Sequence, residues 1–479
     1  MRVRSVALVV VAIGVVAAGA AVGGTIAYEW HPALPAVERP SPERLDPKLV
    51  QRGMELAAIG NCGTCHTKPG SKSLAGGLAI PTPFGRIYST NITPDPETGI
   101  GRWSEAAFRR AMHQGVDREG HHLYPAFPYD HFTLVTGDDN RALYAYLMSR
   151  EPVRSENPKG DLSFPFNLRI VLAGWKLLFL PRGPFRSDPG HDRVWNHGAY
   201  LVEGLAHCGA CHTPRNMFGA ERRDQRFAGG EAEGWTAYAL NADSPSPIPW
   251  DAEALFTYLR QGWHADHGVA RGPMAPVVEN LRTAPEDDVR AIATYMADVL
   301  GPPSTERQRQ AEAIRARLRA PSNTAVPVAS ASRSTTGQAA SASQQGASDA
   351  SIGHLIYVST CAPCHESGRP LPYGGIDFEL STAMQGPDAK NLVSVTLYGL
   401  PPAAGEASPM MPGFGAVLSD QQLVALATYL RSRFSNRPPW SDVEHDVRDA
   451  RAGARPVSIR PGSGTEPAPS DATQRERSQ

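Results

Sequence analysis

Apolar residues recur at helical spacing in three widely separated parts of the chain. Each part contains a tyrosine among apolar neighbours, at residues 143–147, 292–296 and 426–430, and each has a shorter helical stretch upstream, opened by Gly53, Gly198 or Gly353. No run of alternating apolar and polar residues is long enough to indicate a sheet. The pattern therefore predicts an all-α chain in which one helical arrangement occurs three times.

A middle helix is predicted between these two stretches in each part. Ser104, Asp251 and Asp388 are suitable N-cap residues, and an apolar side chain follows each of them four residues later. The middle helices are expected to stop at the next glycine, which is Gly115, Gly262 or Gly399. Capping boxes are expected at the start of two of the last helices, in the pairs Thr283–Glu286 and Ser419–Gln422.

The N-terminal segment indicates export. Arg2 and Arg4 precede residues 5–28, which carry no charge, and basic residues ahead of an apolar stretch stay in the cytoplasm. The stretch is long enough to cross a bilayer. We therefore expect residues 1–28 to be a retained signal or anchor helix, with cleavage between residues 18 and 24 as the alternative. In either case the rest of the chain is expected on the periplasmic side of the cytoplasmic membrane.

Residues 151–190 form a connector that is longer than an ordinary loop. It contains a concentrated apolar segment, residues 168–180, which is too short to span a bilayer. We expect a helix packed between the neighbouring domains. The alternative is a membrane-surface element with Arg169, Lys176 and Arg182 at the lipid headgroups.

Two further segments differ in composition from the rest of the chain. In residues 301–350 a charged, helix-like piece at 306–319 gives way to Ala, Ser, Thr and Gln, which cannot bury enough apolar surface to fold. This part is expected to be a flexible linker. Residues 436–479 are rich in Arg, Asp, Pro and Ser, and we expect them to form a disordered tail.

A five-residue pattern, Cys-x-x-Cys-His, occurs three times and uses every cysteine of the chain. Its residues are Cys62, Cys65 and His66, then Cys208, Cys211 and His212, then Cys361, Cys364 and His365. Two cysteines at this spacing can form thioethers to one porphyrin, and the histidine can then bind the iron. A zinc knuckle would need four ligands at each site, and a thioredoxin-like pair would leave three histidines at one offset unexplained. The pattern predicts three covalent haem c groups.

The three motifs assign the helical parts to three tandem class I cytochrome c domains behind the N-terminal anchor, at residues 46–150, 191–300 and 351–435. A length of 479 residues agrees with about three domains. A net charge of −1 suggests neither nucleic acid nor an acidic surface as a partner. A Gly-Gly pair follows each motif, at 76–77, 229–230 and 374–375, which indicates close approach to a flat cofactor or a turn that needs positive φ.

A haem used for electron transfer needs a second axial ligand, and a methionine raises its potential whereas a second histidine lowers it. Met274 and Met411 lie in proline-containing loops between the middle and last helices. We therefore predict that they bind the second and third irons, with Met410 as the runner-up for the third. Core packing is the ordinary role of methionine and is the alternative for both.

The first domain has Phe127 at the corresponding position, and a phenyl ring cannot bind iron. His131 is the nearest capable side chain and is predicted to be the ligand, followed by His121 or His122. An exposed loop histidine and an open first iron are the alternatives.

These residues resemble the triple-haem cytochrome c subunits of membrane-bound bacterial dehydrogenases, including alcohol, gluconate, aldehyde and nicotinate- or isoquinoline-type enzymes. Besides the three motifs, the likeness is carried by residues 91–95, 98–103, 123–129, 272–275 and 411–414, and it covers nearly everything from residue 46 to residue 434. In the alcohol dehydrogenase type the residue matching Phe127 is commonly methionine. The substitution resembles the subunits that work with molybdenum-containing hydroxylases.

The resemblance implies an electron relay with no substrate chemistry of its own. A catalytic subunit dependent on molybdenum, PQQ or FAD would oxidise a substrate in the periplasm, and the three haems would pass the electrons to ubiquinone or a downstream cytochrome. The alternative is a peroxidase-like haem enzyme that uses an open first haem. Phe127 favours this alternative, but Arg118, Asp130 and His131 form no evident acid–base site around it.

Overall fold

The computed structural model describes residues 30–181, 183–319, 343–402 and 407–453, together with Gly19, Gly23 and Gly24. The expected anchor at residues 1–28 lies outside this set except for those three glycines. Within the described ranges, no helix combines the length and the apolar character needed to cross a bilayer. The chain divides into two compact units, of which the first contains the residues up to 309 except 233–235 and 265–272, and the second contains the rest.

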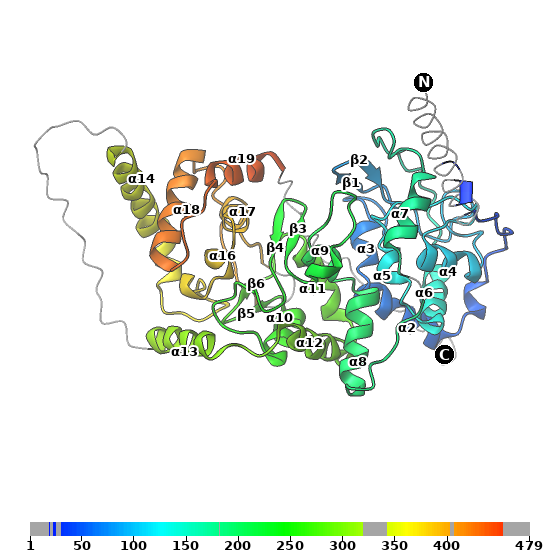
Figure 1. Ribbon diagram of the computed structural model, residues 1–479, viewed down its shortest axis with the longest axis horizontal. Coiled ribbons are helices and arrows are strands. Elements are labelled where there is room, and N and C mark those ends of the chain that lie inside the picture. The colour runs from blue at the N-terminus through cyan, green and yellow to red at the C-terminus, as the bar shows by residue number, and fades with distance from the viewer. Residues whose placement is uncertain are drawn as a thin grey trace, which may run out of the picture. The chain divides into compact units, whose positions relative to one another are not determined.

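Three pairs of helices cross closely, as Figure 1 allows the reader to follow by label. In the first unit α2 (Pro47–Ile59) packs against α6 (Gly137–Ser149), and α8 (Arg193–Tyr200) packs against α12 (Glu286–Leu300). In the second unit α14 (Ser343–Ile356) packs against α18 (Asp420–Phe434). The sequence pattern predicted these helices, and they recur in the expected order.

A glycine lies at the centre of each crossing rather than at the start of its helix. A Cβ on Gly53, Gly198 or Gly353 would overlap the carbonyl oxygen of the facing helix, which belongs to Ala142, Ala291 or Ala425. The expectation that these glycines open their helices was therefore wrong. They are found inside the helices because only a residue without a Cβ lets the two backbones approach this closely.

The middle helices begin and end where their capping residues predict. Ser104 accepts a hydrogen bond from the Ala107 N–H and caps α4 (Glu105–Gln114), and Asp251 caps α10 (Ala252–Gln261) in the same way. Gly115 and Gly262 end these helices in the left-handed conformation, with φ of 59° and 81°. The third middle helix, α17 (Lys390–Tyr398), begins after Ala389, one residue later than expected, and stops at Gly399.

One of the two predicted capping boxes is present. Ser419 and Gln422 exchange the expected hydrogen bonds at the start of α18. The box at Thr283 was wrong, because α11 (Met274–Thr283) continues to that residue and its hydroxyl donates to the Asn280 carbonyl. The next helix, α12, begins after Pro285 instead.

Short strands and turns complete the fold. Strands β1 (Ala79–Thr82) and β2 (Gly85–Tyr88) form an antiparallel hairpin with Ala79 opposite Tyr88, and the other strands are β3 (Gly230–Ala232), β4 (Trp235–Ala237), β5 (Trp263–His264) and β6 (Gly268–Val269). They are too short to produce an alternating pattern, so the sequence did not indicate them. Other short elements are η1 (Pro42–Arg44), η2 (Leu201–Leu205), η3 (Arg223–Gln225), η4 (Tyr357–Cys361), η5 (Phe378–Leu380) and α16 (Thr382–Gln385).

The connector contributes α7 (Val171–Phe179), which is packed on the protein as expected. Leu172 and Lys176 are buried, and the Lys176 ammonium donates to the Gly115 carbonyl at 2.6 Å and lies 2.9 Å from His122 Nδ1. A headgroup position for Lys176 was therefore wrong, because this side chain points into the protein. Arg169 donates to the His122 carbonyl, and Arg182 lies outside the described residues.

The segment after residue 436 corrects the expectation of a disordered tail. Residues Val443–Gly453 form α19, and Trp440, Val443 and Val447 are buried. Val443 and Val447 lie four positions apart on one face of α19, which packs against α17 and α18, and Trp440 precedes the helix. The high content of charged residues in this segment hid that face. Residues 454–479 lie outside the described set. The linker begins with α13 (Thr305–Arg319), as expected, and residues 320–342 are likewise not described.

Each unit has its own apolar core. In the first unit both helix pairs contribute to one continuous cluster, which includes Leu56, Leu143, Leu201, Leu205 and Ile292. A buried carboxylate links the pairs: Asp288 of α12 lies 2.6 Å from Arg52 of α2 and 2.6 Å from His197 of α8. The second unit is built around a separate cluster that includes Tyr357, Met384, Leu423 and Leu430.

Replacing a crossing glycine should destabilise the first unit. In Gly53→Ala or Gly198→Ala the new methyl must push the helices apart, and we expect a loss of about 1–3 kcal/mol or more in the free energy of unfolding. Gly174→Ala is the matched control, because Gly174 lies inside α7 with open space around it, and it should be neutral or stabilising by up to about 1 kcal/mol. Urea denaturation followed by circular dichroism measures all three, and equal curves for Gly53→Ala and Gly174→Ala would contradict the close crossing.

Asp288 should make the stability of the first unit depend on acid pH. Burial alone would raise the pKa of Asp288, but the hydrogen bonds and charges of His197 and Arg52 outweigh it and lower that pKa. Its stabilising effect is therefore present above the ordinary value near 3.8 and is lost as pH falls below it. Asp288→Asn should cost about 1–3 kcal/mol at pH 7. The difference from the parent protein should shrink on titration towards about pH 3, and a gap that stays constant would argue against this role.

Candidate haem centres

Each Cys-x-x-Cys-His motif forms one short helical turn that follows the first helix of its pair. These turns are α3 (Cys62–Cys65), α9 (Gly209–His212) and α15 (Ala362–His365). In the first two, the histidine N–H donates to the carbonyl of the first cysteine, at 3.0 Å for His66 and 3.1 Å for His212. Cysteines three positions apart on a helical turn lie on one face. The two thiols and the imidazole of each motif are thus gathered at one short turn.

All three motif histidines are held by the same hydrogen bond. The Nδ1 atom of His66 lies 2.7 Å from the Thr90 carbonyl oxygen, that of His212 lies 2.7 Å from the Tyr238 oxygen, and that of His365 lies 2.7 Å from the Ile376 oxygen. A backbone carbonyl can only accept, so Nδ1 carries the proton and Nε2 keeps its lone pair. This is the arrangement that orients a metal-binding imidazole.

The electrostatic surroundings of the histidines favour the same form. Partial burial lowers the pKa of His66, of His212 and of His365, more than the backbone hydrogen bond raises it. Each imidazole is therefore neutral at pH 7, which is the state that binds iron.

The glycine pairs lie directly against the motif backbone. The Gly76 N–H donates to the His66 carbonyl at 2.7 Å, the Gly229 N–H to the His212 carbonyl at 2.9 Å and the Gly375 N–H to the Cys364 carbonyl at 3.0 Å. Gly76 and Gly229 have φ of 73° and 95°, as a turn through the left-handed region requires. A Cβ on Gly375 would lie 2.7 Å from the ring of His365. The pairs thus close the loop that follows each motif.

The cysteines do not have the character of a redox pair. No disulfide joins any of the six, all of which the structure describes. Burial raises the pKa of Cys62 and of Cys208 to about 12, and that of Cys361 to about 11. A reactive thiol of a thioredoxin-like site has a lowered pKa instead. The residues of each motif therefore fit covalent attachment of haem better than thiol exchange.

Met274 and Met411 both lie between the middle and last helices of their parts. Met274 was expected in a loop, but it is the first residue of α11 and is packed against the core of the first unit. Met411 is half-buried and forms a two-way backbone bridge with Leu400, at 2.8 and 3.0 Å, just beyond the end of α17. Met410 is 67% exposed, so Met411 is the better placed of the two to face an interior cofactor.

Comparison with known proteins gives the family. Residues 348–430 match the family model described as cytochrome c oxidase, cbb3-type, subunit III. The chain is 43% identical over 441 residues to a nicotinate dehydrogenase subunit of Pseudomonas putida, an alignment that covers 91% of this chain and 34% of that relative, or about a third of its length. It is 35% identical over 434 residues to the fructose dehydrogenase cytochrome subunit of Gluconobacter japonicus, covering 88% of this chain and 86% of the relative.

The gluconate 2-dehydrogenase cytochrome c subunit of Pantoea cypripedii is also 35% identical, over 423 residues, with 84% of this chain and 89% of the relative covered. The chain belongs to the family of dehydrogenase cytochrome c subunits. This confirms the resemblance drawn from the motifs. Such a subunit carries covalent haem c and transfers electrons, and its partner is a dehydrogenase catalytic subunit.

The side chains of Phe127 and His131 have different surroundings from those of the motif histidines. Phe127 is half-buried, with its ring 5.2 Å from that of Phe132. His131 is buried, with Nδ1 2.7 Å from the Glu203 carbonyl and Nε2 2.7 Å from a Glu221 carboxylate oxygen. Iron binding by His131 would require its contact with Glu221 to be broken. The sequence could not show this, because Glu203 and Glu221 are more than 70 residues away.

The next two histidines considered for the first iron are also engaged. His121 is exposed and lies 3.2 Å from an Asp117 carboxylate oxygen, and His122 is held by Lys176 of α7. At the first site Phe127 stands where the other two sites have a methionine, and both of these histidines already have other partners.

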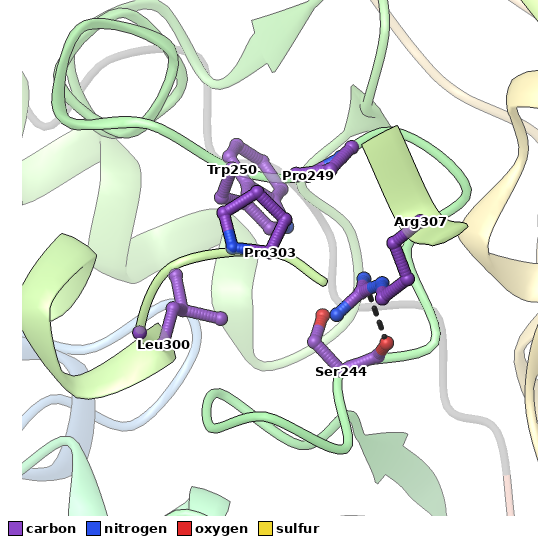
Figure 2. Close-up of a pocket in the computed structure, with 7 residues that line it drawn as sticks. Ser244, Pro249, Trp250, Leu300, Pro303 and Arg307 are labelled. Carbon is purple, nitrogen blue, oxygen red and sulfur yellow. Dashed lines mark hydrogen bonds between the residues drawn. The ribbon is translucent and has the colours of Figure 1, made fainter. Parts of the chain in front are cut away.

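A small hollow in the first unit is lined by no motif residue. Figure 2 shows its lining, which includes Trp250, Leu300 and Pro303, and Arg307 donates to the Ser244 carbonyl at 3.2 Å. Its volume of about 10 Å³ is close to the minimum that holds one water molecule. It has no room for an organic substrate.

Adjacent methionines provide a matched test of the third ligand. Ferric haem bound by methionine has a weak far-red absorption band, and Met411→Leu should abolish the share of that band due to the third haem because leucine has no thioether. Met410→Leu should leave it unchanged. The purified oxidised protein and both variants need only be compared by absorption at equal haem content. Loss of the band in Met410→Leu alone would reverse the assignment.

Proposed function

We propose that this chain carries three covalent haem c groups and relays electrons from a periplasmic dehydrogenase catalytic subunit to the respiratory chain. The observation that supports it best is the threefold recurrence of one ligand arrangement. In three separate parts of the chain a motif histidine directs Nδ1 to a backbone carbonyl at 2.7 Å and keeps Nε2 for a metal. A structural histidine would have no reason to repeat this arrangement beside a pair of cysteines.

Each haem would be held by one motif within a domain of its own, at residues 46–150, 191–300 and 351–435. Cys62 and Cys65, Cys208 and Cys211, and Cys361 and Cys364 would form the thioethers, and His66, His212 and His365 would bind the irons. Haem iron supplies a one-electron couple when bound. The chain's own residues fix the orientation of the imidazoles, close the loop after each motif and exclude water.

The axial ligands would set different potentials at the three sites. Met274 and Met411 favour ferrous iron and raise the potentials of the second and third haems. At the first site Phe127 offers no thioether, so that haem would have either another ligand or none on that side. Sites of unequal potential give an electron relay a direction.

The partner and the location follow from the relatives and the N-terminal sequence. Relatives named as nicotinate, fructose, alcohol and gluconate dehydrogenase subunits support a dehydrogenase catalytic subunit as the partner. That subunit would depend on molybdenum, PQQ or FAD. The basic and then apolar N-terminus supports attachment at the periplasmic face of the cytoplasmic membrane. Ubiquinone or a downstream cytochrome would accept the electrons. The likeness to a nicotinate dehydrogenase subunit, together with Phe127, supports a hydroxylase partner that acts on an N-heterocycle.

The peroxidase-like alternative rests on Phe127 alone. Relatives named as cytochrome subunits do not favour it. The groups near that loop are engaged in structural contacts, since His131 bonds to Glu221 and the Arg118 guanidinium bonds to the Leu34 carbonyl.

Haem content and partner-dependent reduction test the proposal together. Replacing both motif cysteines by Ala in any one motif should remove one third of the covalent haem, measured as the pyridine haemochrome and by intact mass. The parent protein should not oxidise nicotinate, fructose, alcohols or gluconate alone, but the catalytic subunit that co-purifies with it from membranes should reduce it when substrate is added. Fewer than three haems, or oxidation of substrate by the isolated chain, would contradict the proposal.

A further inference from the structure

Two reciprocal contacts join the two helix pairs of the first unit, and both lie at the residue that precedes a motif. In the first contact, the Asn280 amide of α11 donates to the Asn61 side chain and reaches the Thr64 hydroxyl at 3.4 Å. In the second, α5 (Tyr129–Phe132) meets His207, whose ring lies 5.6 Å from that of Phe132 and 6.3 Å from that of His131. Asn61 directly precedes Cys62, and His207 directly precedes Cys208.

The equivalence of these contacts extends to the backbone. Asn61 and His207 both adopt positive φ, 53° and 39°, which turns the chain sharply from its preceding helix into the motif. The helices that contact them are also equivalent. The first, α11, begins at Met274, and α5 begins two residues after Phe127, at the same place in the first domain. We call residues 46–150 and 191–300 the two halves of the first unit, and the motif turns α3 and α9 their attachment turns. In each half, the helix at or just beyond the ligand position packs on the attachment turn of the other half.

A buried ion pair reinforces the second contact. His131 Nε2 lies 2.7 Å from a carboxylate oxygen of Glu221, which belongs to the loop after Cys211. The Cε1 atom of His131 would lie 3.3 Å from a Cβ placed on Gly209, within the second motif. Burial alone would lower the pKa of His131, but the hydrogen bond and charge of Glu221 raise it to about 9. The imidazole is therefore a cation at neutral pH. A buried charge left without its partner is strongly destabilising, so this pair fixes the position of α5.

The apolar contacts between the two halves are also closely packed. A Cβ on Gly60, at the end of α2, would lie 3.0 Å from the Leu205 side chain, which belongs to the other half. Leu56 and Leu205 are fully buried in the same cluster. Such a core does not deform continuously, so the two attachment turns have one fixed separation.

We propose that His131 and Asn280 are positioning residues that lock the first two attachment turns together, so that the haems at Cys62/Cys65 and Cys208/Cys211 behave as one coupled pair. This inference rests on the proposed function, because it requires both haems to be present. Electron passage within the pair would need no further reactant, since the electron lost by one iron would be the electron gained by the other. It would transfer neither a proton nor a chemical group.

The same side chains could in principle ligate a cation, because ligand atoms of Asp130, His131 and Glu221 lie within 4.8 Å of one another. The geometry favours the ion pair. A distance of 2.7 Å between Nε2 and the carboxylate is that of a hydrogen bond. Burial would raise the pKa of Glu221, but the hydrogen bond and charge of His131, with a smaller contribution from Arg215, lower it, whereas burial raises the pKa of Asp130. His131 is thus already the cationic partner of Glu221.

Circular dichroism in the Soret region tests the coupling. Two haems held close in a fixed orientation give a pair of bands of opposite sign. The experiment uses the full chain with Cys361→Ala and Cys364→Ala, so that only the first two haems contribute. His131→Ala combined with Asn280→Ala should lose most of this paired signal, while haem content, the absorption spectrum and far-ultraviolet dichroism stay unchanged. His131→Gln keeps a donor towards Glu221 and should retain more of the signal than His131→Ala.

The controls are exposed residues of the same unit. Asp138→Ala changes an exposed carboxylate of α6, and Thr283→Ala changes an exposed residue of α11, so both should leave the paired signal intact. An unchanged signal in the double variant, or an equal loss in the controls, would overturn the inference. Fewer than two haems in the parent would instead overturn the proposed function. A stoichiometric non-haem divalent metal, found by elemental analysis and lost in His131→Gln, would overturn the ion-pair account.

Discussion

The hydrogen bond from a motif histidine to a backbone carbonyl is the interaction on which the candidate sites depend. It selects the tautomer, fixes the plane of the imidazole and leaves one nitrogen for the iron. Its acceptor must be placed precisely, and the fold does this through the loop that returns to the motif. In that loop the glycine pairs bond to the motif backbone, as Gly76 does to His66, so the acceptor and the imidazole belong to one closed local structure.

That local structure is in turn supported by the helix crossings. The motif turns follow α2, α8 and the helical segment that begins with α14, and each of these crosses a later helix at a glycine. At Gly53 the two backbones are in close contact, because the Ala142 carbonyl oxygen occupies the place that a Cβ would take. The backbone contacts at the crossing would fix the position of the motif turn that holds the haem. A side-chain substitution elsewhere does not easily disturb such contacts.

The sequence could predict whatever is encoded within a few residues and little that is encoded between distant ones. Cys62, Cys65 and His66 and the caps at Ser104 and Asp251 are local signals, and the family likeness follows from motifs that are themselves local. The carbonyl acceptors could not be predicted, since they lie 24, 26 and 11 residues beyond their histidines with no common spacing. The helix α19 was missed because Trp440, Val443 and Val447 occur among charged residues. Thr283 was misplaced because α11 continues to it and its hydroxyl bonds within that helix.

His131 shows how a residue capable of chemistry can be used for assembly instead. Its position next to Phe127 suggested an iron ligand, but Glu221 and Glu203 surround it with acceptors from the other half of the unit. An imidazolium between two acceptors has no lone pair to offer, and removing it from that site would leave Glu221 buried without its partner. The distinct character of the first site therefore comes from the absence of a thioether at Phe127, and His131 acts on the relative placement of the first two sites.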